Sequence, residues 1–127
     1  MEATFEEHVQ ERAVLVGLNA DCFRKDQTAT DETLDELEAL LETAGGFCTG
    51  KVIQNRHTPD PHSFIGEGKA IEVKMLVEAT ASTMAIFDNE LSPGHIRALE
   101  ELLGVTVLDR RALILDIFAH NASQRKP

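Results

Sequence analysis

Four short apolar runs alternate along the chain with longer segments in which apolar residues recur every three or four positions. The runs are Arg12–Leu18, Phe47–Gln54, Thr83–Phe87 and Val105–Leu108. Short runs rich in valine, leucine and isoleucine are typical of strands in a parallel sheet that is covered on both faces. The second run is less apolar than the first, which favours a position nearer an edge of the sheet.

The segments after each run have the spacing and the boundary signals of helices. Thr30 and Ser92-Pro93 are helix-start signals, and Gly45 and Gly104 are stop signals. The predicted buried stripes are Leu34, Leu37, Leu41 and Ala44; Ile71, Met75 and Leu76; Ile96, Leu99, Leu102 and Leu103; and Leu113, Ile114, Ile117 and Phe118. A strand–helix order repeated four times predicts right-handed crossovers. We therefore expect one α/β domain over residues 1–127, with a core at about 11–120 and about four parallel strands with helices on both faces.

Composition is that of a soluble globular protein, with 43% hydrophobic and 27% charged residues. The net charge is −10, most of it in residues 1–46, which argues against broad, charge-driven binding of nucleic acid but leaves local RNA contacts open. Cys22 and Cys48 form neither a disulfide framework nor a metal pattern. No apolar run is long enough to span a membrane, and the acidic N-terminus is unlike a secretion signal, so we expect a cytoplasmic protein.

A glycine-containing loop, Phe64-Ile65-Gly66-Glu67-Gly68-Lys69, precedes one of the predicted helices. Gly66 and Gly68 free the backbone where the helix begins, so the loop can offer N–H groups to an anion. A nucleotide-binding P-loop needs Gly, four residues, Gly-Lys and then Ser or Thr. Ser63 and Ala70 stand at the first and last of these positions. We therefore expect that this chain holds no Mg-nucleotide as a P-loop does, is not an enzyme by itself and needs no cofactor.

Polar residues follow each predicted strand, and in a parallel sheet these ends meet along one rim, where ligands bind. The tips are Asn55-Arg56-His57, Asp88-Asn89-Glu90 and Asp109-Arg110. Three interpretations stay open. The first is an anion pocket of Arg56, Lys69 and Arg110, and the second is a metal site of Asp88, Glu90 and Asp109. The third is a set of ion pairs and caps in which Asp88 or Asp109 holds an arginine. No motif of a catalytic serine, cysteine or histidine is present.

Three segments in series resemble the N-terminal domain of HflX-type GTPases over about residues 10–119. They are Phe64–Lys69, Phe87-Asp88-Asn89-Glu90-Leu91-Ser92-Pro93, and Val107-Leu108-Asp109-Arg110 running into Leu113–Ala119. The resemblance implies a small parallel α/β unit followed by a helical hairpin and a GTPase domain that holds GTP and Mg. It also implies association with the large ribosomal subunit, in ribosome splitting or rescue, with contacts to ribosomal RNA; some family members bind ATP in this part.

The resemblance matches the Gly66–Lys69 loop and Asp109-Arg110 to family positions without assigning roles. We expect nucleotide or RNA contacts among Gly66, Gly68, Lys69, Arg56, Asp88, Asn89, Asp109 and Arg110. Residues 120–127 depart from the family pattern and stop, so we expect an accessory domain whose apolar end near Ile117 and Phe118 packs on the hairpin of a parent protein, or on a second copy. The alternative is a nucleotide (ATP)-binding module, with Lys69 and Arg110 on the phosphates.

Overall fold

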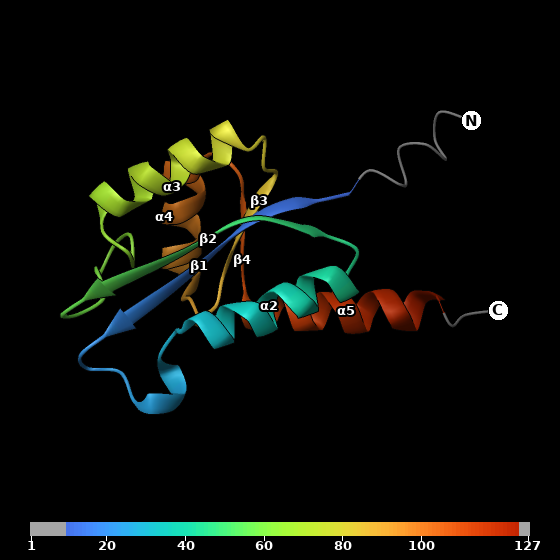
Figure 1. Ribbon diagram of the computed structural model, residues 1–127, viewed down its shortest axis with the longest axis horizontal. Coiled ribbons are helices and arrows are strands. Elements are labelled where there is room, and N and C mark those ends of the chain that lie inside the picture. The colour runs from blue at the N-terminus through green and yellow to red at the C-terminus, as the bar shows by residue number, and fades with distance from the viewer. Residues whose placement is uncertain (1–9, 125–127) are drawn as a thin grey trace.

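Four parallel strands form one sheet in the computed structural model, which describes residues 10–124 (Figure 1). The strands are β1 (Arg12–Ala20), β2 (Phe47–Arg56), β3 (Met84–Phe87) and β4 (Thr106–Asp109), in the order β2-β1-β3-β4. The predicted α/β fold and parallel sheet are confirmed. The expectation that the second strand lies at an edge is also confirmed, and β1 is central and buried on both faces.

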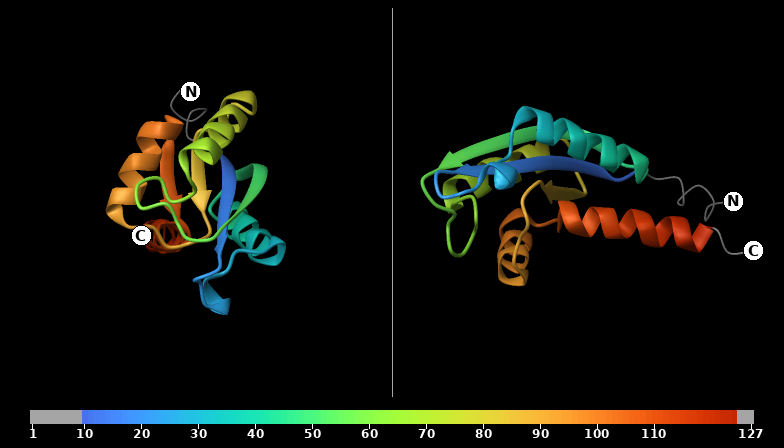
Figure 2. Two further views of the ribbon diagram at one scale, coloured as in Figure 1. Left: turned by 90° about the vertical axis from the view of Figure 1, so that its left-hand side faces the viewer. Right: turned by 90° about the horizontal axis from the view of Figure 1, so that it is seen from below.

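Helices cover both faces of the sheet, as the alternation predicted (Figure 2). Their bounds are α2 (Asp31–Thr43), α3 (Glu67–Ala79), α4 (Pro93–Leu103) and α5 (Arg110–Gln124), with a short 3-10 helix η1 (Lys25–Gln27) before α2. Helices α3 and α4 lie on one face, and α2 and α5 lie side by side on the other. None of the helices within residues 10–124 has the length and apolar character to cross a membrane.

The core has two layers, one on each face of the sheet. Val14, Val16 and Leu18 of β1 point toward α3 and α4, whereas Ala13 and Leu15 point toward α2 and α5. This alternation follows from the two-residue period of a strand. Because both sets of side chains on β1 are buried, its sequence is an unbroken apolar run, as predicted for a central strand.

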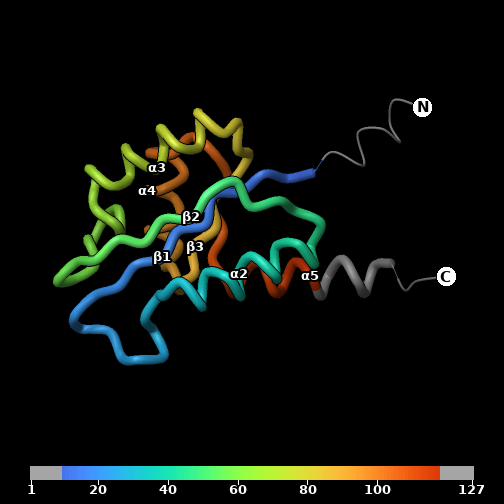
Figure 3. The backbone as a smooth tube through the Cα atoms, viewed as in Figure 1, coloured from blue at the N-terminus to red at the C-terminus, as the bar shows by residue number. Residues whose placement is uncertain are grey.

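The strands differ in length, and this difference splits the predicted rim into two levels. β1 and β2 pair as far as Ala20 and Arg56, whereas β3 pairs with β1 only as far as Val16 and Phe87. The four extra residues carry β1 and β2 about 13 Å past the ends of β3 and β4. Figure 3 shows the two long strands running past the short ones. The tip at 55–57 therefore lies beyond the tips at 88–90 and 109–110.

The predicted buried stripe of α3 is wrong. Ile71 and Met75 are 58% and 64% exposed, and the buried residues are Ala70, Val73 and Val77. Leu76 is half-buried against the core. Apolar residues occur on both sides of this helix, so spacing alone could not select the buried face.

Helix boundaries follow local capping chemistry. Thr30 Oγ1 accepts a hydrogen bond from Thr33 N at 3.1 Å, and Ser92 Oγ accepts one from His95 N at 3.1 Å. Both predicted helix starts are thus confirmed, and Gly104 ends α4 in the left-handed conformation at φ 75°. α5 begins at Arg110, directly after the last residue of β4. The side chain of Phe118, part of the predicted stripe of α5, lies outside the described residues.

Candidate functional site

A cavity of about 710 Å³ opens beyond the carboxyl ends of β1 and β3. These strands are neighbours, but the chain leaves β1 toward α2 on one face and leaves β3 toward α4 on the other. Such a switch point leaves a crevice, and open parallel sheets bind ligands there. The walls of the crevice come from the β1–α2 loop, the first turns of α2, the residues after β3 and the start of α5, with Phe64 from the β2–α3 loop.

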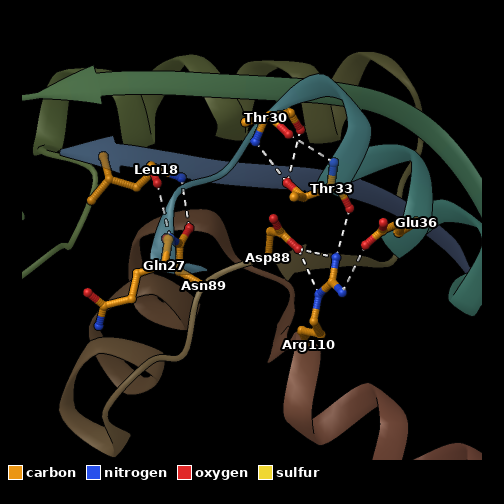
Figure 4. Close-up of polar contacts among 8 residues, drawn as sticks. All are labelled: Leu18, Gln27, Thr30, Thr33, Glu36, Asp88, Asn89 and Arg110. Carbon is orange, nitrogen blue, oxygen red and sulfur yellow. Dashed lines mark hydrogen bonds and ion pairs between the residues drawn. The ribbon is translucent and has the colours of Figure 1, made fainter. Parts of the chain in front are cut away.

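Arg110 joins three of these elements (Figure 4). Asp88 Oδ1 accepts a hydrogen bond from Arg110 Nε at 2.8 Å and lies 2.6 Å from Nη2. Nη2 also donates to the carbonyl oxygen of Thr33 at 2.8 Å, and Nη1 lies 3.6 Å from Glu36 Oε1. The Asp88 side chain is only 6% exposed and that of Arg110 is 29% exposed. The guanidinium therefore fastens the start of α5 to the end of β3 and to the first turn of α2.

Asn89 extends the sheet past the end of β3. Its Oδ1 accepts from Leu18 N at 2.8 Å, and its Nδ2 donates to Leu18 O at 3.0 Å and to Gln27 O at 3.2 Å. The side-chain amide thus does for Leu18 what the peptide group of a neighbouring strand would do. Figure 4 shows the same amide holding the β1–α2 loop at the rim of the crevice.

Asp109 caps α5 rather than facing a ligand. Its Oδ1 accepts from Ala112 N at 2.8 Å and its Oδ2 accepts from Leu91 N at 3.1 Å, and the side chain is 4% exposed. Within residues 10–124, no cluster of three or more histidine, cysteine or acidic side chains has an arrangement that could hold a metal ion. The contacts of Asp88 and Asp109 are those of the ion-pair and cap interpretation.

The other predicted contact residues gather at the start of α3. Arg56 Nε donates to Thr58 O at 2.9 Å, and a Cβ on Gly66 would lie 2.5 Å from Arg56 Nη1. Gly66 has φ 89°, so this position requires glycine, whereas the space around Gly68 is open. Lys69 Nζ lies 3.1 Å from Glu72 Oε1. Neither Arg56 nor Lys69 lines the crevice, so the structure does not bring them together with Arg110 in one pocket.

Asp60 stabilises the turn that leads into this loop. One of its carboxylate oxygens accepts from the backbone N–H groups of Ser63 and His62, both at 2.8 Å. These two hydrogen bonds favour the ionised form and hold the pKa of Asp60 below its usual value. The turn is closed by two backbone hydrogen bonds between Asp60 and Phe64, at 2.9 and 3.0 Å.

Two phenylalanines of the α3/α4 side of the core also line the crevice. Phe23 belongs to the β1–α2 loop, and Phe64 belongs to the β2–α3 loop. Phe64 has φ 66°, a left-handed conformation that non-glycine residues seldom adopt. The sequence signal that could have identified Phe23 as a crevice residue is its position as a phenylalanine inside an otherwise polar loop.

Comparison with known proteins shows the family of this chain. Residues 31–119 match the model of a family described as GTP-binding GTPase N-terminal. A protein named GTPase HflX from Lacrimispora saccharolytica is 40% identical over 118 residues, which are 93% of this chain and 27% of that protein. The GTPase HflX of Escherichia coli K12 is 42% identical over 112 residues, 88% of this chain and 25% of that protein.

A solved structure supports the fold. A GTP-binding protein from the archaeon Sulfolobus solfataricus, in complex with GDP, has a TM-score of 0.62 at 24% identity, covering 87% of this chain and 30% of that chain. The chain spans about a quarter of the length of the curated relatives it matches. The resemblance noted from the sequence motifs is confirmed, and the chain belongs to the GTP-binding GTPase N-terminal family as an N-terminal domain of the HflX type.

Proposed function

We propose that this chain works as the non-catalytic accessory domain of an HflX-type GTPase that associates with the large ribosomal subunit in ribosome splitting or rescue. The observation that carries the proposal is the match of nearly the whole chain to proteins named GTPase HflX, of which it covers about a quarter. The sequence itself contains no G-x-x-x-x-G-K-[ST] segment. GTP and Mg would therefore bind in another domain of the parent, which we place in the cytoplasm.

The domain would act as a rigid support for the part of the parent that follows it. α5 is the last described element, and Arg110 fastens its first turn to β3 and α2. A helix fixed in this way at its base sets the direction of whatever continues from it. The proposed ribosomal contact lies at the start of α3, where Arg56 and Lys69 flank uncapped backbone N–H groups.

Co-sedimentation of the chain with purified large ribosomal subunits tests this proposal. We expect binding that weakens as salt rises, because contacts to RNA phosphates release counterions. Arg56→Glu should reduce the co-sedimenting fraction, whereas Lys74→Glu, at an exposed position on α3, should leave it unchanged. In a full-length relative, deletion of this domain should lower subunit binding in the presence of a non-hydrolysable GTP analogue. Unchanged binding after the deletion would rule out the proposed role.

Self-association through α5 is part of the same proposal, since the face that would pack on a helical hairpin is open in the isolated chain. Leu115 is 62% exposed on α5, and Ile117 is half-buried against the α2/α5 core. We expect a concentration-dependent dimer by sedimentation velocity, and we expect Leu115→Ser to weaken it. A monomer at the highest attainable concentration would contradict this part.

A second candidate function is nucleotide binding in the crevice, which the cavity of about 710 Å³ at the switch point favours. Titration with ATP, followed by the amide resonances of Gln27 and Asn89, tests this candidate. Shifts confined to the crevice would support it. An unchanged spectrum at millimolar ATP would remove it and leave the ribosomal proposal in place.

A further inference from the structure

Two large apolar side chains on α3 face solvent. Ile71 and Met75 are each more than half exposed, and they lie one helical turn apart on the side of α3 that faces away from the sheet. The other large apolar side chains exposed to this degree within residues 10–124 are Phe47 and Leu115, which belong to two different elements. Adjacent exposed apolar side chains, unlike single ones, indicate a surface that contacts another molecule.

Charged side chains of both signs flank this apolar pair. Glu67 and Lys74 lie on one flank, are exposed and form no ion pair within residues 10–124. They are seven residues apart, which brings them to the same side of the helix but leaves them about 10 Å from each other along its axis. On the opposite flank, Glu72 Oε1 lies 3.1 Å from Lys69 Nζ.

The two pairs of opposite charges share one midpoint along the helix. The midpoint between Glu67 and Lys74 and the midpoint between Lys69 and Glu72 both fall directly before Ile71. In two antiparallel helices related by a two-fold axis at this point, the same flank of each helix faces its copy with the residue order reversed. Glu67 then faces Lys74 of the second copy. Lys69 likewise faces Glu72 of the second copy, and Ile71 faces Ile71.

The surroundings of α3 fit such a pairing. The space around Gly68 is open, so Met75 of the second copy can pack over it. Repulsion between two chains of net charge −10 would be greatest where acids gather, and α2 alone carries six of them. α2 lies on the other face of the sheet, whereas α3 carries three acids and two lysines (Figure 1). Contact through α3 therefore keeps the acidic helices apart.

We propose that two copies of this chain form a dimer through their α3 helices, which run antiparallel about a two-fold axis next to Ile71. Ile71 and Met75 of both copies form the apolar centre, and the ion pairs between Glu67 and Lys74 fix the register. One pair of 13-residue helices is a small interface, so we expect a reversible dimer with a dissociation constant of about 0.1 mM.

The dimer would cover Gly68 and Lys69, which belong to the start of α3. The ribosomal contact proposed above lies at the same place, so a chain bound to the large subunit would not be dimerised through α3. This consequence rests on the proposed function, whereas the dimer itself does not.

Sedimentation equilibrium of the chain at up to about 1 mM tests the proposal. All chains carry Leu115→Ser, which weakens association through α5. Lys74→Glu and Glu67→Lys should each weaken the dimer at least about tenfold, because each places like charges opposite one another at two points. An equimolar mixture of the two variants should dimerise within about threefold of the chain without them, since each variant supplies the charge that the other lacks.

Controls separate this pairing from a general effect of charge or folding. Glu101→Lys, the same charge change at an exposed position on α4, should leave the dissociation constant within about threefold. Ile71→Ala, with its fold checked by circular dichroism, should weaken the dimer about tenfold, and an unchanged dimer would overturn the proposal. A monomer at about 1 mM, or a mixture that stays monomeric, would also overturn it. Recovery with Glu78→Lys in place of Glu67→Lys would overturn the register.

Discussion

Asn89→Ala is the substitution whose effect follows most directly from the structure. β3 ends opposite Val16, so the N–H and C=O of Leu18 have no strand beside them on that side. Asn89 supplies both partners and also binds Gln27 O, three hydrogen bonds in all, from a side chain in a residue 9% exposed. Alanine removes all three and leaves the N–H of a fully buried leucine without an acceptor.

The expected loss is about 3 kcal/mol in the free energy of unfolding, from about 1 kcal/mol for each hydrogen bond. An unsatisfied buried N–H alone costs about 1–3 kcal/mol, which agrees with this figure. For a domain of this size the midpoint of thermal unfolding should fall by roughly 10 °C. Urea denaturation followed by circular dichroism gives the free energy, and thermal denaturation gives the midpoint.

Asn55→Ala is the matched control. Asn55 is an exposed asparagine at the tip of β2, and its loss should change the free energy of unfolding by less than about 0.5 kcal/mol. If Asn89→Ala destabilised the protein no more than Asn55→Ala does, Asn89 would not be acting as a substitute strand. The conclusion that Asn89 holds the β1–α2 loop at the rim of the crevice would then be wrong.

Three further outcomes follow from the region around α3. Gly66→Ala should destabilise the protein by about 1–3 kcal/mol, since a backbone φ of 89° is strained for alanine. Gly68→Ala should stabilise it by up to about 1 kcal/mol, because the space around Gly68 is open. Urea denaturation of the two variants measures both changes. Val73→Ala should lower the free energy of unfolding by about 2 kcal/mol, because Val73 is buried, whereas Ile71→Ala should lower it by less than about 0.5 kcal/mol. Equal losses for the two variants would contradict the assignment of the buried face of α3. The pKa of Asp60 is lowered in the folded protein, so its stabilising effect is full above its ordinary pKa and is lost as pH falls. The difference in the free energy of unfolding between the wild type and Asp60→Ala should therefore become smaller below about pH 4. A difference that stays constant down to about pH 2 would show that ionisation of Asp60 does not stabilise the fold.

The sequence predicted the elements and their order because the responsible signals are local. Thr30 and Ser92 cap helices through hydrogen bonds that span three residues, and Gly104 ends a helix through its own φ angle. An apolar run and a helical stripe have different periods, so strands and helices could be told apart. The prediction failed for α3, where Ile71 and Val73 lie on different faces of a helix with apolar residues on both.

The candidate site was predictable in its position but not in its contacts. Asp88, Asn89 and Arg110 lie at the carboxyl end of the sheet, as the strand–helix alternation indicated. Their partners lie far away in the sequence, since Asn89 binds Leu18 across 71 residues and Arg110 binds Thr33 across 77. The lengths and the register of the strands place the tip at 55–57 beyond the tips at 88–90 and 109–110. They depend on such long-range contacts and not on any local pattern.

Two of the segments that carry the family resemblance therefore describe how the crevice is built more than what it binds. Asp109 caps the helix that Arg110 begins, and Arg110 in turn is held by Asp88, so each of these side chains has its main partner inside the fold. A substitution at Asp88 or Asp109 would therefore act first on the packing of α5 against the sheet and α2.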